Sequence, residues 1–130
     1  MYEETTRLIS VSVEPQYLEN QSHPDDGKFV WAYTITVRNT GWETVKLMTR
    51  HWIITDGLGR TQEVKGDGVV GEQPTLKPGD SFEYTSGCPL NTSSGMMRGS
   101  YQMINEMMQV FDVIIPAFSL DSPHDKHSVN

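Results

Sequence analysis

A chain of 130 residues with 36% hydrophobic content is large enough for one domain with a core of its own. Its formal charge of −7 excludes a general nucleic-acid binder, because that class needs a dense basic surface. A single cysteine, Cys88, excludes an internal disulfide and favours a cytoplasmic protein. We expect no signal peptide, because residues 1–5 have neither a basic start nor an apolar run, and no membrane insertion, because no stretch approaches ~18 apolar residues.

Strands are predicted wherever apolar side chains alternate with polar ones, because successive side chains of a strand point to opposite faces. In the first half of the chain we predict strands at 9–14, 29–37, 45–56 and 61–64, a polar loop at 19–27, and turns at 39–41 and 56–59. The strand at 29–37 has the clearest signal, because every second residue is aromatic or β-branched. We expect this heavy face to belong to the core.

The second half of the chain continues the same pattern. In chain order we predict a glycine-rich motif at 66–71, a turn at 78–80, a strand at 81–87, a polar loop at 89–95, and a hairpin of strands 96–104 and 110–115 around 105–108. Residues 116–120 end the ordered part, so that residues 1–120 form the domain. The polar residues 121–130 are predicted to be a disordered tail.

The spacing of these strands defines a fold class. About seven or more short strands, separated by turns every 8–12 residues or so, are typical of a β-sandwich of immunoglobulin or fibronectin III type. No helix of normal length is predicted. The lone Cys88 cannot supply the Cys…Trp…Cys pattern of true immunoglobulin domains, so a single-domain, all-β, fibronectin III-like sandwich is preferred. A small barrel is the alternative.

The glycine motif matches a pattern known from dinucleotide-binding folds. Residues 66–71 read Gly-Asp-Gly-Val-Val-Gly, the G-x-G-x-x-G pattern that needs a helix directly after it. Pro74, Pro78 and Gly79 exclude that helix here. Three interpretations stay open: a crossing between sheets that needs residues with positive φ, a nest of N–H groups for phosphate or pyrophosphate, or a loop that binds a partner.

Basic residues near the motif extend it to a candidate anion or nucleotide site. The candidate residues are Gly66, Gly68, Gly71, Lys65, Arg50 and His51. Alternation within the strand at 45–56 predicts that Arg50 and Trp52 share one face, while His51 and Ile53 share the other. Arg50 or His51 would complete the site if this strand lies beside the glycine loop. The alternative is structural: a histidine that supports the fold, and an arginine that donates to loop carbonyls.

Catalytic and metal sites have less support. Cys88 has no neighbouring base in the sequence, and a lone cysteine near the end of a sheet is more often a small buried apolar residue. We therefore predict no catalytic residue and lean against an enzyme. His124 and His127 offer metal ligands within the tail, but we expect adventitious binding there, and we predict no specific metal site and no cofactor.

Two adjacent methionines, Met107 and Met108, fall in the turn of the last predicted hairpin. Exposed methionines form adaptable apolar surfaces that suit a protein partner. The alternative is that the pair folds back onto the sheet. The sequence does not decide between these two arrangements.

Several segments of the chain resemble a known family. They are 50–56 (RHWIITD), 64–74 (VKGDGVVGEQP), 78–90 (PGDSFEYTSGCPL), 97–103 (MRGSYQM) and 115–120 (IPAFSL). In this order and spacing, from about residue 9 to residue 120, the chain resembles the bacterial ApaG family. The resemblance implies a fibronectin III-like β-sandwich without an established catalytic activity.

The resemblance also carries expectations about function. Related domains in eukaryotic F-box proteins and in a DNA-polymerase-interacting protein look like protein-interaction modules. The bacterial family is associated with cobalt resistance and magnesium efflux, and its glycine motif has prompted suggestions of nucleotide or pyrophosphate binding. We therefore expect a non-enzymatic binding module that contacts a protein partner through an exposed sheet edge or the loop at 66–74. Phosphate, pyrophosphate or nucleotide binding is the alternative, direct binding of a divalent metal is a further one, and free strand edges permit a homodimer.

Overall fold

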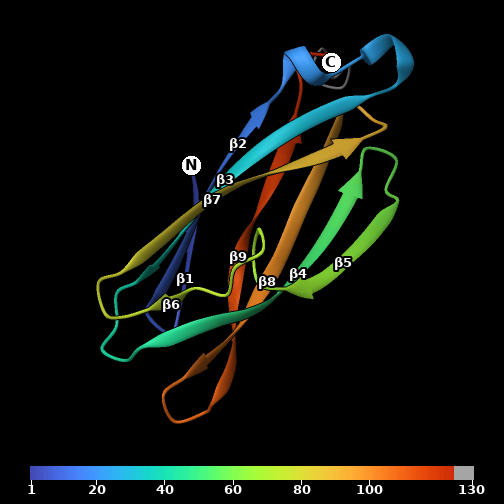
Figure 1. Cartoon of the computed structure of the whole chain (residues 1–130). Coiled ribbons are helices and arrows are strands. Elements are labelled where there is room, and N and C mark those ends of the chain that lie inside the picture. The colour runs from blue at the N-terminus through green and yellow to red at the C-terminus, as the bar shows by residue number, and fades with distance from the viewer. Residues whose placement is uncertain (125–130) are drawn as a thin grey trace.

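The computed structural model describes residues 1–124, and Figure 1 shows its course. Within that range the chain forms nine strands: β1 (Tyr2–Thr6), β2 (Ile9–Tyr17), β3 (Phe29–Asn39), β4 (Val45–Asp56), β5 (Thr61–Asp67), β6 (Thr75–Leu76), β7 (Ser81–Leu90), β8 (Ser94–Asn105) and β9 (Val110–Asp121). Two single turns of 3-10 helix, η1 (Glu19–Gln21) and η2 (Pro24–Asp26), lie in the predicted polar loop. No helix in residues 1–124 has both the length and the hydropathy that crossing a bilayer requires.

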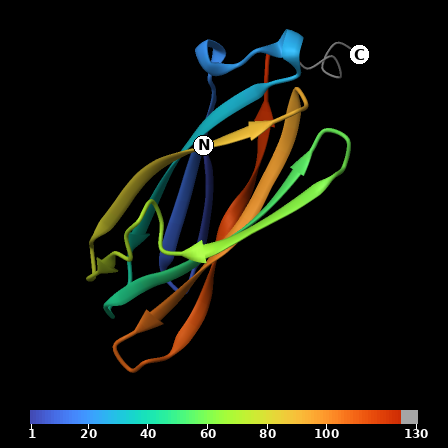
Figure 2. The ribbon, with the colours of Figure 1, turned by 45° about the vertical axis from the view of Figure 1, so that its right-hand side comes forward.

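The strands form two antiparallel sheets that face each other (Figures 1 and 2). One sheet has the order β1-β2-β3-β7, and the other has the order β5-β4-β8-β9, with β6 pairing on β4. The predicted all-β sandwich of fibronectin III-like type is therefore confirmed. The chain crosses between the sheets from β6 to β7, so the glycine motif lies just before this crossing.

The core forms between the sheets, where the alternation predicted for residues 29–37 directs the large side chains. In β3 every second residue is buried, and the residues between them are more exposed. The indole N–H of Trp31 donates to the carbonyl oxygen of Asp121 at 2.9 Å, which ties β3 to the end of β9 in the other sheet. The rings of Trp52 and Phe118 meet edge to face with centroids 6.0 Å apart, an arrangement that adds to the burial of their apolar surface.

Two strands were missed by the sequence prediction, and both lack the signal on which it depends. β1 has the sequence YEETT, whose three central side chains are exposed, so no apolar alternation marks it. It forms because its backbone pairs with β2 along its whole length. β6 has only two residues, which is too short for any periodicity to appear.

The predicted end of the last strand at residue 115 was wrong, because β9 continues to Asp121. Proline lacks the N–H that a strand ladder needs, which made Pro116 look like a terminator. The ladder between β8 and β9 shifts here: Ile115 pairs with Gly99, and Phe118 pairs with Met97. Pro116 lies within this irregularity and needs no ladder partner, as at a β-bulge.

Of the predicted tail at 121–130, the structure describes the first four residues. Asp121 ends β9, and Ser122 is buried. The ring of His124 lies 5.9 Å from that of Tyr17, and its Nε2 is 3.3 Å from Oε1 of Glu19. Residues 125–130, which include His127, lie outside the described residues.

The two long sides of the sandwich differ. On one side β1 and β2 contact β9 of the other sheet. There the Tyr2 hydroxyl and Ser119 Oγ share a hydrogen bond of 3.2 Å, and the N–H of Ile114 donates to Thr6 Oγ1 at 3.2 Å. We call this the closed side. On the other side β5 and β7 are the edges of their sheets, and within residues 1–124 no strand pairs with their outer edges. We call this the open side.

Candidate functional site

The glycine motif folds into a tight turn that follows β5. Val70 and Gly71 have φ of 42° and 82°, and two successive residues with positive φ characterise a type I′ turn. The N–H of Val69 donates to the Glu72 carbonyl oxygen at 2.8 Å, and the N–H of Glu72 donates back at 2.9 Å. Val69 is fully buried, so the turn is anchored in the core. No helix follows, as the prolines predicted.

Each glycine of the motif has a structural cause. A Cβ at Gly68 would collide with the carbonyl oxygen of Glu72, and Gly68 also has a φ of 63°. Gly71 has room around it, but its φ of 82° disfavours other residues. A Cβ at Gly66 would lie 2.8 Å from the guanidinium nitrogens of Arg50. The predicted positive φ is found at Gly68 and Gly71. The predicted crossing between sheets was wrong, because the motif joins β5 to β6 within one sheet. The close contact at Gly66 was not predicted.

The amide groups of the loop are largely engaged within the protein. The N–H of Gly68 donates to the Met48 carbonyl oxygen at 2.8 Å, and Gln73 Nε2 donates to the same oxygen at 2.9 Å. The N–H groups of Val69 and Glu72 bond each other's carbonyls across the turn. An anion at this loop would have to compete with these bonds, which weakens the case for a nest of free N–H groups.

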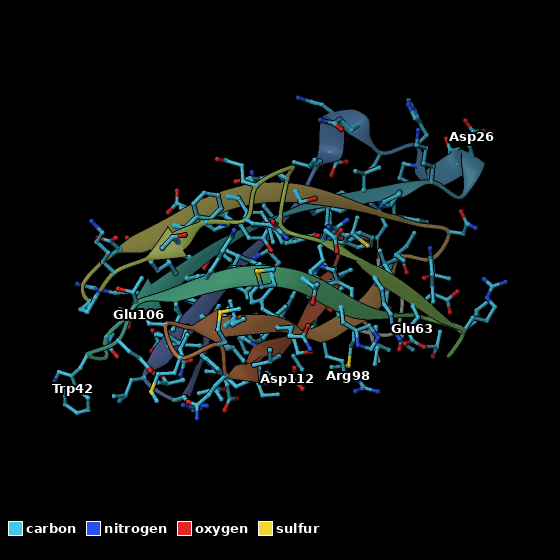
Figure 3. The ribbon with its side chains drawn as sticks, turned by 60° about the horizontal axis from the view of Figure 1, so that its bottom comes forward. Asp26, Trp42, Glu63, Arg98, Glu106 and Asp112 are labelled. Carbon is cyan, nitrogen blue, oxygen red and sulfur yellow. The ribbon has the colours of Figure 1, made fainter. Side chains whose placement is uncertain are left out.

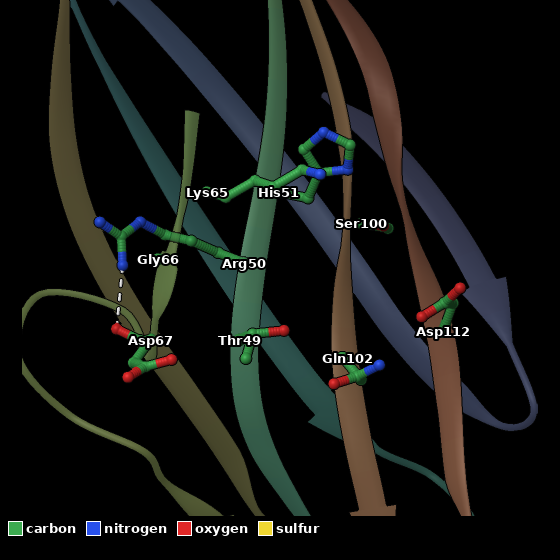
Figure 4. Close-up of a pocket in the computed structure, with 9 residues that line it drawn as sticks. All are labelled: Thr49, Arg50, His51, Lys65, Gly66, Asp67, Ser100, Gln102 and Asp112. Carbon is green, nitrogen blue, oxygen red and sulfur yellow. Dashed lines mark hydrogen bonds between the residues drawn. The ribbon is translucent and has the colours of Figure 1, made fainter. Parts of the chain in front are cut away.

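Arg50 extends from β4 into the space between the sheets, on the same face as the buried Trp52. Its Nη1 donates to the carbonyl oxygen of Asp67 at 2.9 Å (Figure 4). The same nitrogen donates to the carbonyl oxygen of Gly68 at 3.0 Å. This arrangement matches the structural alternative of an arginine bonded to loop carbonyls. Since Gly66 has no side chain, the guanidinium lies directly against its backbone and is held there.

His51 and Lys65 lie on the opposite, outer face of the same sheet. An open hollow of about 450 Å³ lies beside them; its lining also includes Thr49, Arg50, Gly66, Asp67, Ser100, Gln102 and Asp112 (Figure 4). His51 Nε2 hydrogen-bonds Oε1 of Glu63, and Lys65 Nζ is 3.8 Å from the same oxygen. Four of the six candidate residues therefore line this hollow: Arg50, His51, Lys65 and Gly66. Arg50 also lines a cavity with Trp52, on the other face of the sheet. Gly68 and Gly71 lie in the turn that follows β5.

The outer face carries acidic as well as basic side chains. Figure 3 shows the acidic Glu63 and Asp112 and the basic Arg98 projecting from it. Asp67 also lines the hollow. In residues 1–124, no three His, Cys, Asp or Glu side chains are grouped so that they could hold a metal ion.

The open side contains a second cavity, which the sequence analysis missed. It is a cleft of about 280 Å³ between the edges of β5 and β7, lined by Tyr33, Arg50, Trp52, Ile54, Val64 and Met97, with the β7 segment 86–89 along its rim. We call it the edge cleft. Its lining comes from five strands. The alternation of side chains in a sequence shows which face of each strand points inward, but it does not show that two sheet edges leave a gap between them.

Comparison with known proteins places the chain in a family. A family model described as the ApaG domain matches residues 19–105. This chain belongs to the ApaG family. Protein ApaG of Paramagnetospirillum magneticum is 60% identical and Protein ApaG of Bradyrhizobium diazoefficiens is 58% identical, each over 130 residues and the full length of both chains. The crystal structure of an ApaA protein from Bordetella pertussis has a TM-score of 0.87 at 47% identity and covers 96% of this chain and all of that one.

Three of the five segments that carry the ApaG resemblance border the open side, whereas residues 115–120 lie on β9 at the closed side. Residues 50–56 lie on β4, residues 64–74 form the end of β5 and the glycine loop, and residues 78–90 include all of β7. Each of the three contributes side chains to the edge cleft. These three segments therefore surround a cavity as well as forming the glycine turn.

Cys88 lies in this region of the ApaG fold but is poorly suited to be a nucleophile. Only 3% of the residue is exposed, and burial raises the pKa of its thiol to about 11. The reactive thiolate is therefore scarce at neutral pH. Nearby, the hydroxyls of Tyr84 and Tyr101 share a buried hydrogen bond, and burial raises the pKa of both phenols.

The far end of the sandwich carries an exposed apolar tip. Trp42 is 88% exposed. Met107 and Met108 are 78% and 75% exposed, so the pair does not fold back onto the sheet. Figure 3 shows Trp42 and Glu106 at the same end, and the N–H of Thr44 donates to Glu106 Oε1 at 3.1 Å. Trp42 was missed because a single aromatic residue in a turn carries no periodic signal.

Proposed function

We propose that this ApaG-family chain is a non-enzymatic module that binds an extended segment of a partner protein at its open side. The observation that supports this is the pair of free strand edges, β5 and β7, on either side of a partly apolar cleft. A free edge presents unpaired N–H and C=O groups, which an added strand satisfies, while side-chain pockets beside it supply selectivity.

The edge cleft combines exposed and buried apolar groups in the way a recognition site requires. Trp52 and Met97 are buried at its floor, whereas Ile54 and Val64 are only half-buried. A partner side chain that enters the cleft would cover them and remove apolar surface from water, at about 25 cal/mol per Å². The chain's own charges on β5, at Glu63 and Lys65, disfavour pairing of that edge with indiscriminate strands.

The proposed setting is the cytoplasm, and the proposed partner is a protein rather than a nucleic acid. The thiol of Cys88 is free, as is usual for a reducing compartment. A second copy of this chain is a weaker choice of partner, because a formal charge of −7 on each copy makes them repel.

Site-specific photo-crosslinking in cells tests the proposal. A photoreactive amino acid is placed at Ser86, on the rim of the edge cleft, and in a control chain at Glu3, exposed on the closed side. The proposal expects a discrete product from position 86 that is absent from position 3 and that excess unlabelled wild-type chain competes away. Identical products from both positions, or none from position 86, contradict it.

The alternative of phosphate, pyrophosphate or nucleotide binding is favoured by one observation on the outer face. His51 and Lys65 stand on neighbouring strands beside the hollow of about 450 Å³, where an anion would meet the Lys65 ammonium and the His51 ring in competition with Glu63. Titration of ¹⁵N-labelled protein with pyrophosphate and ATP is expected to shift the amides of 49–51 and 65–67. A Lys65→Gln variant that responds as strongly as the wild type would exclude this site.

The family's association with cobalt resistance and magnesium efflux leaves direct metal binding as a last alternative. If the protein binds metal directly, Co²⁺ or Mg²⁺ should raise its melting temperature. The same increase should be measured for a variant that ends at Leu120. A rise that disappears on truncation would assign the metal to the tail with His124 and His127, where binding is adventitious.

A further inference from the structure

The lining of the edge cleft indicates which kind of segment it binds. From its shape and charge we infer that it takes an extended peptide with an apolar side chain and, two residues along, a carboxylate that pairs with Arg50. This inference rests on the proposed function and adds the chemistry of the partner.

The cleft is sized for a side chain. Its volume of about 280 Å³ is below the ~300–1,000 Å³ typical of pockets for small molecules and cofactors. Its floor is aromatic, with the rings of Tyr33 and Trp52 edge to face at 5.3 Å, and its walls include Ile54 and Val64. An aliphatic or aromatic side chain is the group that such a floor accepts.

Arg50 supplies the only charge. Of the described residues that line the cleft, no other carries an ionised group at neutral pH. Its Nη1 is bonded to the carbonyls of Asp67 and Gly68, while its Nε and Nη2 have no hydrogen-bond acceptor among residues 1–124. Guanidinium groups bind carboxylates through two parallel N–H donors, so these remaining donors are suited to an acidic group.

The guanidinium is also held in place before any ligand arrives. Two carbonyl oxygens fix one nitrogen, and the backbone of Gly66 lies against the plane of the group. A fixed side chain loses little further freedom on binding, which favours affinity. This gives the absence of a side chain at Gly66 a functional meaning beside the structural one.

The spacing of the ligand groups follows from strand geometry. Trp52 and Arg50 are two residues apart on one face of β4, which separates them by about 6.6 Å along the strand. A peptide that lies extended in the cleft presents its own side chains at the same interval, so an apolar residue over Trp52 brings the residue two positions away to Arg50. Ser86 and Gly87 on the rim are small and let a peptide backbone approach β7 closely.

Three synthetic peptides test the inference. Each is an octapeptide of serine and threonine, acetylated and amidated at its ends, with Leu-Thr-Asp, Leu-Thr-Asn or Ala-Thr-Asp at its centre. Binding to the full chain is followed through ¹⁵N amide shifts and fluorescence anisotropy. We expect the Leu-Thr-Asp peptide to shift amides of β5 and β7, and the other two to bind at least about tenfold more weakly.

Variants locate the carboxylate. Arg50→Gln is expected to abolish the preference for Asp over Asn, whereas Arg98→Gln, which removes one positive charge from the outer face, is expected to keep it. Should Arg50→Gln fail to fold, Arg50→Lys keeps the charge but not the paired donors, and it is expected to reduce the preference at least about threefold.

The outcomes separate the inference from the proposed function. Equal binding of the Asp and Asn peptides with shifts at 61–67 and 81–90 would overturn the role of Arg50 and leave strand addition at the open side standing. A preference for Asp that Arg98→Gln removes would move the carboxylate to the outer face and also overturn it. If no peptide shifts the amides of β5 or β7, the peptide chemistry is wrong, and crosslinking from position 86 decides the proposed function separately.

Discussion

The closed and open sides of this sandwich are built from similar strands but end differently. At the closed side, Tyr2 lies on Phe118 with ring centroids 6.0 Å apart and hydrogen-bonds Ser119, so that β1 covers the gap between the sheets. At the open side, the guanidinium of Arg50 and the cleft beside it occupy the corresponding position. A β-sandwich can therefore obtain a binding surface by leaving one side unsealed, with no change to its core.

The largest expected effect comes from breaking the loop that holds Arg50. Gly68→Ala should destabilise the protein by about 3 kcal/mol or more, because the new Cβ meets the Glu72 carbonyl in a backbone region with positive φ. Urea unfolding followed by tryptophan fluorescence measures the loss. Gly71→Ala, with positive φ but open space, is the control and should lose only about 1 kcal/mol. Equal losses would show that the contact with Glu72 does not matter.

The pH dependence of stability tests whether water reaches the buried thiol of Cys88, which lines the edge cleft. Burial raises the pKa of Cys88 from an ordinary 9 to about 11, so the folded state holds the thiol proton more tightly than the unfolded state. The associated stability is complete below pH 9 and is lost as the pH rises to 11. Across that range we expect the wild type to lose about 2 kcal/mol more than Cys88→Ala.

Urea unfolding at several pH values in reducing buffer measures this difference. Buried Tyr84 and Tyr101, whose pKa values burial also raises, destabilise both proteins alike at high pH. The pKa of Tyr33 is raised mainly by burial and in smaller part by Cys88, so Cys88→Ala also reduces the loss that comes from this tyrosine. The difference between the two curves therefore reports on Cys88. Parallel curves would mean that water reaches Cys88 through the cleft.

Tyr2→Ala tests how much the contacts at the closed side contribute to stability. Tyr2→Ala removes the ring on Phe118 and the hydrogen bond to Ser119, and it should cost about 1–2 kcal/mol, since the tyrosine is only half-buried. Hydrogen exchange should rise in β1 and in residues 114–119 but not in β7. Glu3→Ala, exposed on the same strand, is the control and should change stability by less than about 0.5 kcal/mol. Faster exchange in β7 would mean that the two sides are coupled.

The smallest expected effect comes from the turn that joins β8 to β9, the strand that β1 and β2 contact at the closed side. Met108 has a φ of 63° and is 75% exposed, so Met108→Gly relieves backbone strain and loses almost no packing. We expect a gain of about 0.5–1 kcal/mol. Met107→Gly, equally exposed but not in this backbone region, should instead destabilise. A loss for both variants would show that the tip residues pack against something.

Much of the architecture could be predicted because it depends on local alternation. The faces of β3 and β4 follow from which residues alternate, and the separation of Arg50 from His51 was predicted correctly for this reason. β1 could not be predicted, since a strand with exposed polar side chains is defined by the partner backbone it pairs with. β9 was cut short at Pro116 because a ladder irregularity is a property of two strands and leaves no mark on either alone.

The sequence by itself determined that residues 66–71 are not a dinucleotide-binding turn, because Pro74 and Pro78 exclude the helix that such a turn requires. It also determined which side chains face inward on the main strands. The contact of Arg50 with Gly66, beside a cleft between β5 and β7, could be seen only in the folded structure. The physical reason is that alternation assigns the two faces of a strand, whereas the identity of edge strands and of residues that meet across the sandwich depends on how distant strands pair.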